Sequence, residues 1–241
     1  MFILKGGTTH MKMRTREEIK SLSLDEKLAF FKICGTAFIV DAMNLLRLRR
    51  WWMHGIRPMK DGQKLVAPAY TVRLERNRQD EPMYTAYDVV EDCPVGHALV
   101  VANIKDSFLV GGNVITLADI RGIPGMVLEG CNRDIADIRA LKIAMYSQGV
   151  GAVVLPTDIK SSYTPAPCVE IGDGKIYKGD IIVGDDDGVI AVPQEHLDEI
   201  IYQAEMIADM EADGAEALKK NLYTPREFYQ KIITRKKSPR P

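Results

Sequence analysis

The sequence predicts an α/β protein, built as one layered α/β/α domain with a mixed, partly parallel sheet and helical N- and C-terminal ends. Three observations predict this class. Short apolar segments alternate with glycine turns and helix-like runs over residues 98–148, which is the pattern of βαβ units with parallel strands. Further short apolar segments follow, separated by Gly-Asp pairs of the kind that form turns. Helical patterns precede and follow these strands.

The chain divides into three predicted segments. Residues 1–22 are largely polar and basic and are expected to be a flexible lead-in. Residues 23–222 are expected to form a single α/β domain. Residues 223–241 are expected to be a C-terminal helix and basic tail, because three basic residues stand together at 235–237.

Two helices and a strand are predicted at the start of the domain. Ser23 is the expected N-cap of the first helix, and Glu26 stands three residues later, as a capping box requires. A second helix is expected over 39–46. The apolar run 65–74 predicts a strand, and its Pro68 favours a sheet edge or a bulge.

The centre of the chain predicts βαβ units, and its end predicts short strands and a long amphipathic helix. The expected elements are, in order, strand 97–102, helix 114–121, strand 125–130, helix 133–142, strand 144–146, strands 168–171, 181–184 and 188–193, and helix 195–220. Gly122 directly follows the predicted helix 114–121, in the position that glycine prefers beyond a helix C-terminus.

Composition excludes several classes of protein. The 241 residues are 46% hydrophobic and 27% charged, which is an ordinary globular mixture. The 32 Lys and Arg nearly balance the 33 Asp and Glu, so neither a nucleic-acid binder working by bulk charge nor a cationic membrane surface is expected. No uncharged apolar run is long enough to span a membrane. Four scattered cysteines fit a reducing compartment, so we expect a cytoplasmic protein.

Two polar corners follow predicted strands. The segment 131–137 contains Arg133 and Asp134 at the start of a predicted helix, and the turn 111–113 lies one βα unit earlier. If the two strands are neighbours, both corners face one crevice, where open α/β sheets place ligands. Free N–H groups at a helix start attract anions, and an arginine adds a planar fork for a carboxylate. The alternative is structural: an N-terminal Asp often only caps a helix, and paired glycines often only make a turn.

Blocks in a fixed order carry a resemblance to a known family over roughly residues 35–211. These blocks are Gly35-Thr36-Ala37 with Asp41, Gly55-Ile56-Arg57-Pro58, residues 65–72, Gly112 with Arg133-Asp134 and Asp137, Gly179-Asp180, and residues 184–189. In them the chain resembles the RraA-like family, which includes the regulator of ribonuclease activity A and the 4-hydroxy-4-methyl-2-oxoglutarate aldolases.

The resemblance implies a metal-dependent enzyme that assembles with copies of itself. Family members are trimers, which in some members pair into hexamers, and their active site lies at a subunit interface. Their enzymes use Mg²⁺ or Mn²⁺ and act on pyruvate-type 2-oxo acids. By motif position, the segment whose backbone N–H groups cradle the substrate carboxylate corresponds to Gly111, Gly112, Asn113 and Val114.

The resemblance also implies roles for four charged residues. Arg133 matches the substrate-binding arginine, and Asp134 matches the metal ligand. Both are therefore the expected catalytic residues. Asp41 and Glu211 match acidic groups that reach in from a neighbouring subunit.

One departure from the family pattern decides the expected reaction. The aldolases of the family carry an Asp at the position of Gly112, whereas the regulators carry Gly. Aldol cleavage must remove a hydroxyl proton, which a carboxylate assists, whereas decarboxylation needs no base. We therefore expect a carbon–carbon lyase on short 2-oxo acids that favours oxaloacetate decarboxylation over aldol cleavage. The alternatives are a non-enzymatic regulatory binding protein and a 2-oxo acid or sugar-acid enzyme of another substrate.

Overall fold

The computed structural model divides the chain into two compact units, Met1–Arg49 with Glu195–Pro241, and Arg50–Gln194. The residues that the structure describes are 2–5, 8–49, 51–76, 84–102, 108–151 and 161–240. The segment predicted as a single domain therefore divides between two units, because its helical ends pack on each other while its strands build a core of their own.

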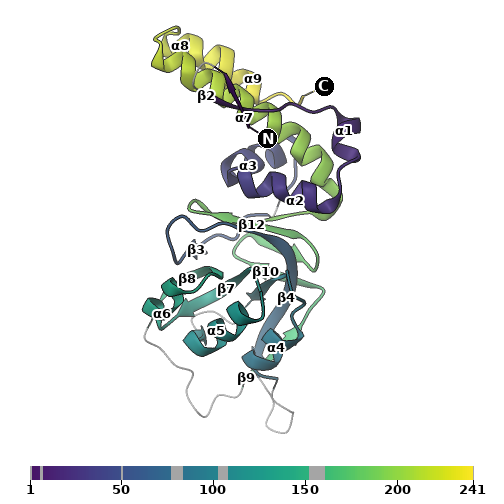
Figure 1. Ribbon diagram of the computed structural model, residues 1–241, viewed down its shortest axis with the longest axis vertical. Coiled ribbons are helices and arrows are strands. Elements are labelled where there is room, and N and C mark those ends of the chain that lie inside the picture. The colour runs from purple at the N-terminus through teal and green to yellow at the C-terminus, as the bar shows by residue number, and fades with distance from the viewer. Residues whose placement is uncertain are drawn as a thin grey trace. The chain divides into compact units, whose positions relative to one another are not determined.

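The second unit is built on a mixed sheet. Its strands are β3 (Arg57–Pro58), β4 (Leu65–Arg76), β5 (Ala98–Ala102), β6 (Phe108–Val110), β7 (Gly125–Asn132), β8 (Ala144–Val150), β9 (Ser161–Pro165), β12 (Ile181–Asp185) and β13 (Gly188–Val192). In the described residues these form one sheet of order β13-β12-β4-β5-β7-β8-β3, with β6 on β7 and β9 on β4 (Figure 1). Strands β10 (Cys168–Ile171) and β11 (Gly174–Tyr177) form a separate hairpin.

The sheet is parallel at its centre and antiparallel at its ends. Strands β4, β5, β7 and β8 run parallel, in that order. The pairs β12–β13, β12–β4, β3–β8 and β4–β9 are antiparallel. The predicted α/β class with a mixed, partly parallel sheet is confirmed.

Three helices pack along one face of the sheet in the second unit (Figure 1). They are α4 (Ala86–Asp92), α5 (Gly112–Ile120) and α6 (Ile135–Ala140). Strand alternation fills both faces: in β4, Tyr70 and Val72 join the core under the helices, whereas Ala67 and Ala69 join the core on the opposite face. Ile115 of α5 is fully buried against the first core, and burial of such a side chain stabilises the fold by about 1.5–3 kcal/mol.

Of two predictions made for a glycine and a proline at element boundaries, one is confirmed and the other is not. Gly122 follows the end of α5 with φ +78°, the left-handed conformation that its predicted place beyond the helix requires. Pro68 does not lie at a sheet edge, because β4 pairs with β12 on one side and β5 on the other. The ladder with β5 begins only at Ala69, so Pro68 precedes it.

The first unit is mostly helical. Its elements are the hairpin β1 (Phe2–Lys5) and β2 (Thr8–Met11), helices α1 (Arg16–Lys20), α2 (Leu24–Ile33), α3 (Thr36–Leu45), α7 (Leu197–Lys219), α8 (Pro225–Phe228) and α9 (Thr234–Lys236), the 3-10 turn η1 (Gln194–His196) and the π turn η2 (Tyr229–Ile233). Ser23 and Glu26 form the predicted capping box of α2. The predicted lead-in contains ordered elements, since Thr15 and Glu18 form a second capping box that starts α1.

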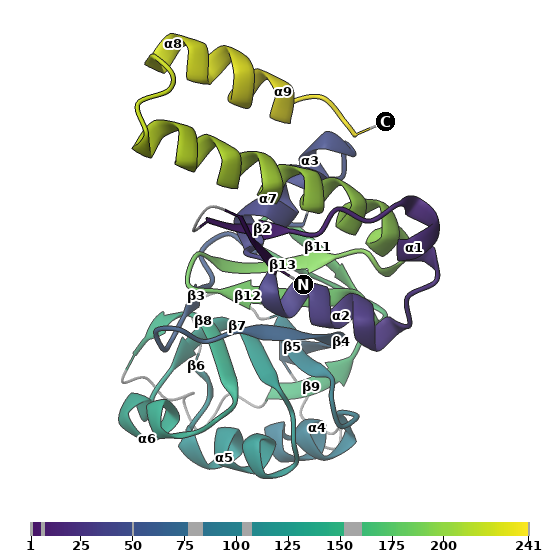
Figure 2. The same cartoon turned by 45° about the horizontal axis from the view of Figure 1, so that its top comes forward.

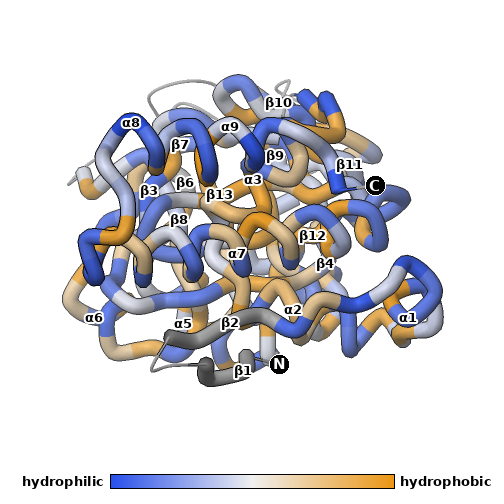
Figure 3. The backbone as a smooth tube through the Cα atoms, turned by 90° about the horizontal axis from the view of Figure 1, so that it is seen from above, coloured by the Kyte–Doolittle hydropathy of each residue, from blue (hydrophilic) through white to orange (hydrophobic). Residues whose placement is uncertain are grey.

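Helix α7 organises this unit. The helical segment from α8 to α9 folds back along α7 (Figure 2), where Phe228 and Ile232 approach Gly214 closely. Apolar and polar residues alternate along the α7 tube in Figure 3, as expected of a helix with one buried face. Among the described residues no single helix is long and apolar enough to cross a membrane; α2 and α3 reach that length and composition only together, as a pair bent by 115°.

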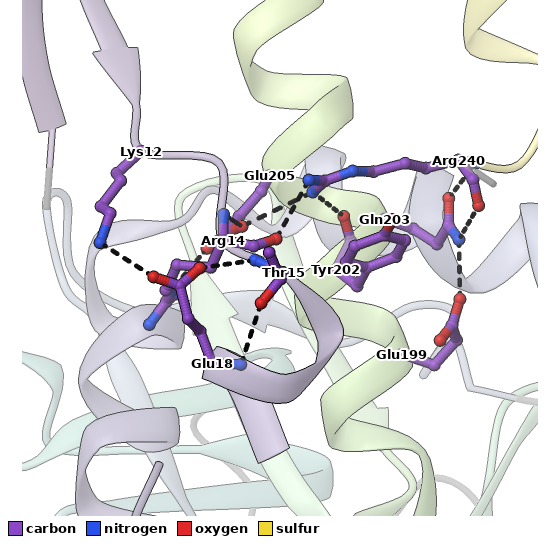
Figure 4. A network of polar contacts seen from close by, with 9 residues as sticks. All are labelled: Lys12, Arg14, Thr15, Glu18, Glu199, Tyr202, Gln203, Glu205 and Arg240. Carbon is purple, nitrogen blue, oxygen red and sulfur yellow. Dashed lines mark hydrogen bonds and ion pairs between the residues drawn. The ribbon is translucent and has the colours of Figure 1, made fainter. Parts of the chain in front are cut away.

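A buried carboxylate in α7 ties both ends of the unit together (Figure 4). Glu205 has no exposed side-chain area, and its Oε1 accepts from Arg14 Nε at 2.6 Å. Its Oε2 accepts from the Arg14 backbone N–H at 2.8 Å and lies 3.8 Å from Arg240 Nη1. Tyr202 lies between the guanidinium groups of Arg16 and Arg240, at 4.1 and 3.9 Å from its ring centre.

Glu205→Gln should destabilise the first unit by about 3 kcal/mol, because it leaves two largely buried guanidinium groups without their carboxylate. Glu199→Gln is the matched control, since the Glu199–Arg16 pair is partly exposed and should lose about 1 kcal/mol or less. Urea unfolding followed by circular dichroism measures both. Equal losses in the two variants would contradict the role given to Glu205.

Candidate functional site

A pocket of about 390 Å³ opens where α4, α5 and α6 begin, after strands β4, β6 and β7. This is the carboxyl edge of the parallel strands, the place where α/β sheets bind ligands. The lining residues are Thr85, Ala86, Tyr87, Val110, Gly111, Gly112, Asn113, Val114, Arg133, Asp134 and Asp137. The two corners predicted from the sequence therefore meet in one concave site.

The two corners are joined by a hydrogen bond. Gly111 is the N-cap of α5 and offers no side chain to cap it. The N–H of Gly112 instead donates to Asp134 Oδ2 at 2.8 Å. A carboxylate at a helix N-terminus is favoured by the helix dipole and by N–H groups that lack acceptors within the helix. Asp134 thus caps a helix other than the one it precedes.

Asp134 reaches α5 because its own backbone is left-handed. It occupies the N-cap position of α6 with φ 62° and ψ 38°, and its side chain makes no cap hydrogen bond to α6. This conformation costs a residue other than glycine about 1–3 kcal/mol. The structural alternative for Asp134, an ordinary cap of its own helix, is therefore not what the chain adopts.

The paired glycines make room for the acidic corner. A Cβ at Gly111 would lie 3.0 Å from Asp134 Oδ2 and 3.4 Å from Arg133 Nε. A Cβ at Gly112 would lie 3.2 Å from Asp134 Cβ. Side chains at either position would therefore push the charged groups away from the start of α5.

The two charged side chains are accessible from solvent. Arg133 Nε lies 3.7 Å from Asp134 Oδ2, and the side chains are 43% and 42% exposed. An ion pair this open is weak, so both groups can exchange partners with a ligand. Asp134 Oδ1 has no hydrogen-bond or ion-pair partner among the described residues.

The acidic groups suit a hard cation that shares its shell with a ligand. No cluster of three or more His, Cys, Asp or Glu able to hold a metal ion occurs in the described part of the chain, so a closed protein cage is not formed there. Mg²⁺ usually keeps several waters and takes one or two carboxylates together with substrate oxygens. The open Oδ1 of Asp134 fits that requirement, and Asp137 adds a second carboxylate to the lining.

The structure brings six of the predicted site residues together and leaves two elsewhere. The six are Gly111, Gly112, Asn113, Val114, Arg133 and Asp134. Asp41 lies in α3 and Glu211 in α7, both in the first unit. Their expected role as acids from a neighbouring subunit stays a prediction.

The wall that α4 contributes to the pocket was not predicted from the sequence. Thr85, Ala86 and Tyr87 line the pocket, and the side chain of Tyr87 is half exposed. The available sequence feature was the spacing Thr85-x-x-Asp88, which forms a capping box and fixes where α4 begins.

Comparison with known proteins identifies the family. A family model described as RraA-like, Aldolase/RraA, matches residues 36–191. The chain belongs to the RraA-like family. In this RraA-like chain, both corners of the candidate site, Gly112 and Arg133-Asp134, lie inside the matched segment.

Individual relatives of this RraA-like chain carry different names. Protein DlpA of Legionella pneumophila is 27% identical over 171 residues, which are 70% of this chain, but the chain spans only 28% of that relative. A Halalkalibacterium halodurans protein named "putative 4-hydroxy-4-methyl-2-oxoglutarate aldolase" is 27% identical over 207 residues, covering 84% of this chain and 93% of the relative.

The fold is shared with solved structures of the family. Streptomyces coelicolor RraAS2, described as an unusual member of the RNase ES inhibitor RraA protein family, superposes with a TM-score of 0.62 at 21% identity. The match covers 82% of this chain and 94% of that chain. At this identity the likeness establishes the fold and leaves the activity to be argued from the site.

Gly111→Ala should weaken binding of oxalate, a small dicarboxylate, by about tenfold or more in the presence of Mg²⁺, a loss of about 1.4 kcal/mol. The added methyl group would displace Asp134 Oδ2 and Arg133 Nε. Because these atoms belong to flexible, partly exposed side chains, the melting temperature should fall by only a few degrees, as for loss of a glycine N-cap worth about 1 kcal/mol.

Isothermal titration calorimetry measures the binding. Gly149→Ala is the matched control, because a Cβ there would meet nothing within 4 Å. Unchanged oxalate affinity in Gly111→Ala would show that the corner does not form the binding site.

Proposed function

We propose that this RraA-like protein is a divalent-metal-dependent carbon–carbon lyase acting on short 2-oxo acids, with oxaloacetate decarboxylation as its favoured reaction. The observation that carries the proposal is the hydrogen bond from Gly112 N–H to Asp134 Oδ2, which joins the glycine turn to the Arg133-Asp134 corner. The aldolase name of the H. halodurans relative supports the general class of lyase.

Binding of the substrate rests on two sources of positive charge. The start of α5 presents the backbone N–H of Asn113, in a helix long enough to carry a dipole, whereas the Val114 N–H donates to Gly111 O at 3.1 Å. Arg133 adds a guanidinium that is always charged and can hold a carboxylate through two hydrogen bonds. Together they orient the C1 carboxylate and the 2-oxo oxygen of a three- or four-carbon acid at one end of the pocket.

Asp134 would hold the divalent ion, Mg²⁺ or Mn²⁺, through its open oxygen. When bound, the ion supplies positive charge to the carboxylate and 2-oxo oxygens of the substrate. The protein's own contribution is to fix Asp134 by the Gly112 N–H, so that the carboxylate is aimed before any ligand arrives.

The reaction breaks the C3–C4 bond of oxaloacetate. The electron pair of that bond moves into the enolate of pyruvate, C4 leaves as CO₂, and C3 then takes a proton from water. Negative charge builds on the 2-oxo oxygen as the bond breaks. Arg133 stabilises that charge, and a single such contact is typically worth about 10²–10³ in rate.

Gly112 favours decarboxylation over aldol cleavage. Aldol cleavage must first remove a hydroxyl proton, and Gly112 carries no carboxylate to assist that step. A larger side chain at this position would also meet Asp134 Cβ at 3.2 Å.

A second candidate is a non-enzymatic regulatory protein. One observation favours it: the Asp134 carboxylate already caps α5, a structural role that needs neither metal nor substrate. The RNase ES inhibitor family named for the S. coelicolor neighbour contains proteins of that description. This candidate predicts that the Asp134 carboxylate matters for stability alone.

The assembly belongs to the proposal as well. We propose a cytoplasmic homotrimer, or a hexamer of two trimers, in which Asp41 and Glu211 of one copy serve the site of a neighbouring copy. Nucleic acid and membranes are not expected as partners of this site. Sedimentation velocity, with and without Mg²⁺, measures the state of association.

Purified protein should release pyruvate from oxaloacetate with Mg²⁺ or Mn²⁺ faster than the metal alone does. Asp134→Asn should lower the metal-stimulated rate by about 10² or more, because Asn keeps the left-handed backbone but binds cations weakly. Arg133→Lys should lose about tenfold or more, since one ammonium does not replace the fork. Coupled detection of pyruvate measures the rates.

Two exposed residues outside the pocket provide matched controls. Asp173→Asn and Arg139→Lys make the same chemical changes and should leave the rate unchanged. Metal-stimulated turnover that survives in Asp134→Asn would rule out the proposed metal ligand. Absence of turnover by the wild-type protein, with normal folding, would favour the regulatory candidate.

A further inference from the structure

We propose that the first unit holds a second, separate binding groove for a small phosphate ester that also carries hydroxyl or amine groups. The groove has a volume of about 610 Å³, within the range of small-molecule sites. It is lined by Asp41, Asn44, Leu45, Arg47, Arg49, Ile233, Lys237 and Pro239. All of these belong to the first unit, so the groove is complete within it.

The charge of the lining indicates an anionic ligand. Arg47, Arg49 and Lys237 contribute three cations, against the one carboxylate of Asp41. The C-terminal segment adds to this potential: residues 219–240 contain eight Lys and Arg and one acidic residue, in a chain of net charge -1. Such a local field attracts anions even though the whole chain is nearly neutral.

Arg47 gives the strongest indication of a ligand. The N–H groups of Arg47 and Leu48 donate to the carbonyls of Asn44 and Met43, which ends α3 in a Schellman turn. This turn places Arg47 at φ 57°, a conformation for which glycine or asparagine is the favourable residue. Arginine is therefore a poor choice for the turn itself.

No contact in the described residues compensates for this choice. The Arg47 side chain is exposed and makes no hydrogen bond or ion pair with any residue that the structure describes. A residue that is unfavourable for its local backbone conformation, with no compensating contact, often lies at a functional site. An anion in the groove supplies the missing partner.

Arg49 and Lys237 are held at the groove by neighbouring groups. Arg49 Nη1 donates to Leu48 O at 2.9 Å and lies 3.4 Å from Asn44 Oδ1, which leaves its other N–H groups available. Lys237 Nζ lies 3.3 Å from the hydroxyl of Tyr229. Arg49 also satisfies the Leu48 carbonyl just beyond the end of α3, whereas the Arg47 side chain has no such role.

The remaining lining residues define the rest of the ligand. The side-chain amide of Asn44 is suited to a hydroxyl or amine group of the ligand. Leu45, Ile233 and Pro239 offer apolar surface to a carbon skeleton. A phosphate ester with a hydroxyl-bearing body, of the class of sugar phosphates and nucleotides, satisfies both parts, whereas inorganic phosphate satisfies only the first.

Calorimetric titration with ADP, glucose 6-phosphate and inorganic phosphate tests the proposal. We expect at least one ester to bind with a Kd below about 1 mM and at least tenfold tighter than inorganic phosphate. Arg47→Gly should weaken that binding at least tenfold while the melting temperature stays the same or rises, because glycine suits the turn. A residue with only a structural role would not separate the two readouts in this way.

Arg235→Gln removes one exposed charge from the same segment but not from the groove, and it should leave ester binding unchanged. Three results would overturn the proposal. One is no binding of either ester at about 1 mM. Another is equal loss in Arg47→Gly and Arg235→Gln with tighter binding of a single-stranded oligonucleotide, which would indicate a nucleic-acid surface. The third is a change of oligomeric state in Arg47→Gly, which would indicate an interface between copies.

Discussion

The candidate site depends on one hydrogen bond between two βα units, from the Gly112 N–H to Asp134 Oδ2. It joins the start of α5 to a residue at the start of α6, and it exists because Asp134 adopts a left-handed backbone. Without it, the carboxylate would be an ordinary helix cap and the glycine turn an empty anion site. With it, a carboxylate, a guanidinium and the helix start share one pocket, which is what the proposed 2-oxo acid substrate requires.

Much of this arrangement could be predicted from the sequence, because parallel strands end at one edge of a sheet. From that rule, the turn 111–113 and the corner at Arg133 are predicted to lie close together without any measured distance. The left-handed backbone of Asp134 and the hydrogen bond of its side chain to the start of α5 could not be predicted. Both depend on how α5 and α6 pack against each other in three dimensions. The same holds for α7, whose predicted apolar face was confirmed but whose buried Glu205 is explained only by Arg14 and Arg240.

Departures from local preference give this chain its functional detail. Among the described residues, three other than glycine have positive φ: Arg47, Asp134 and Asn221. Asparagine and aspartate are the commoner choices there, whereas arginine is not; Arg47 and Asp134 are both charged and line the two pockets discussed above. The near-zero net charge conceals this organisation, because the C-terminal segment is strongly basic and the rest of the chain is acidic.

A crystal structure of the protein grown with Mn²⁺ and oxalate tests the central claim most directly, because the anomalous scattering of manganese locates the ion independently of any activity. The account predicts an anomalous peak bonded to the Asp134 carboxylate, with oxalate between it and Arg133. A peak bonded to other residues, or oxalate bound away from the start of α5, would contradict it.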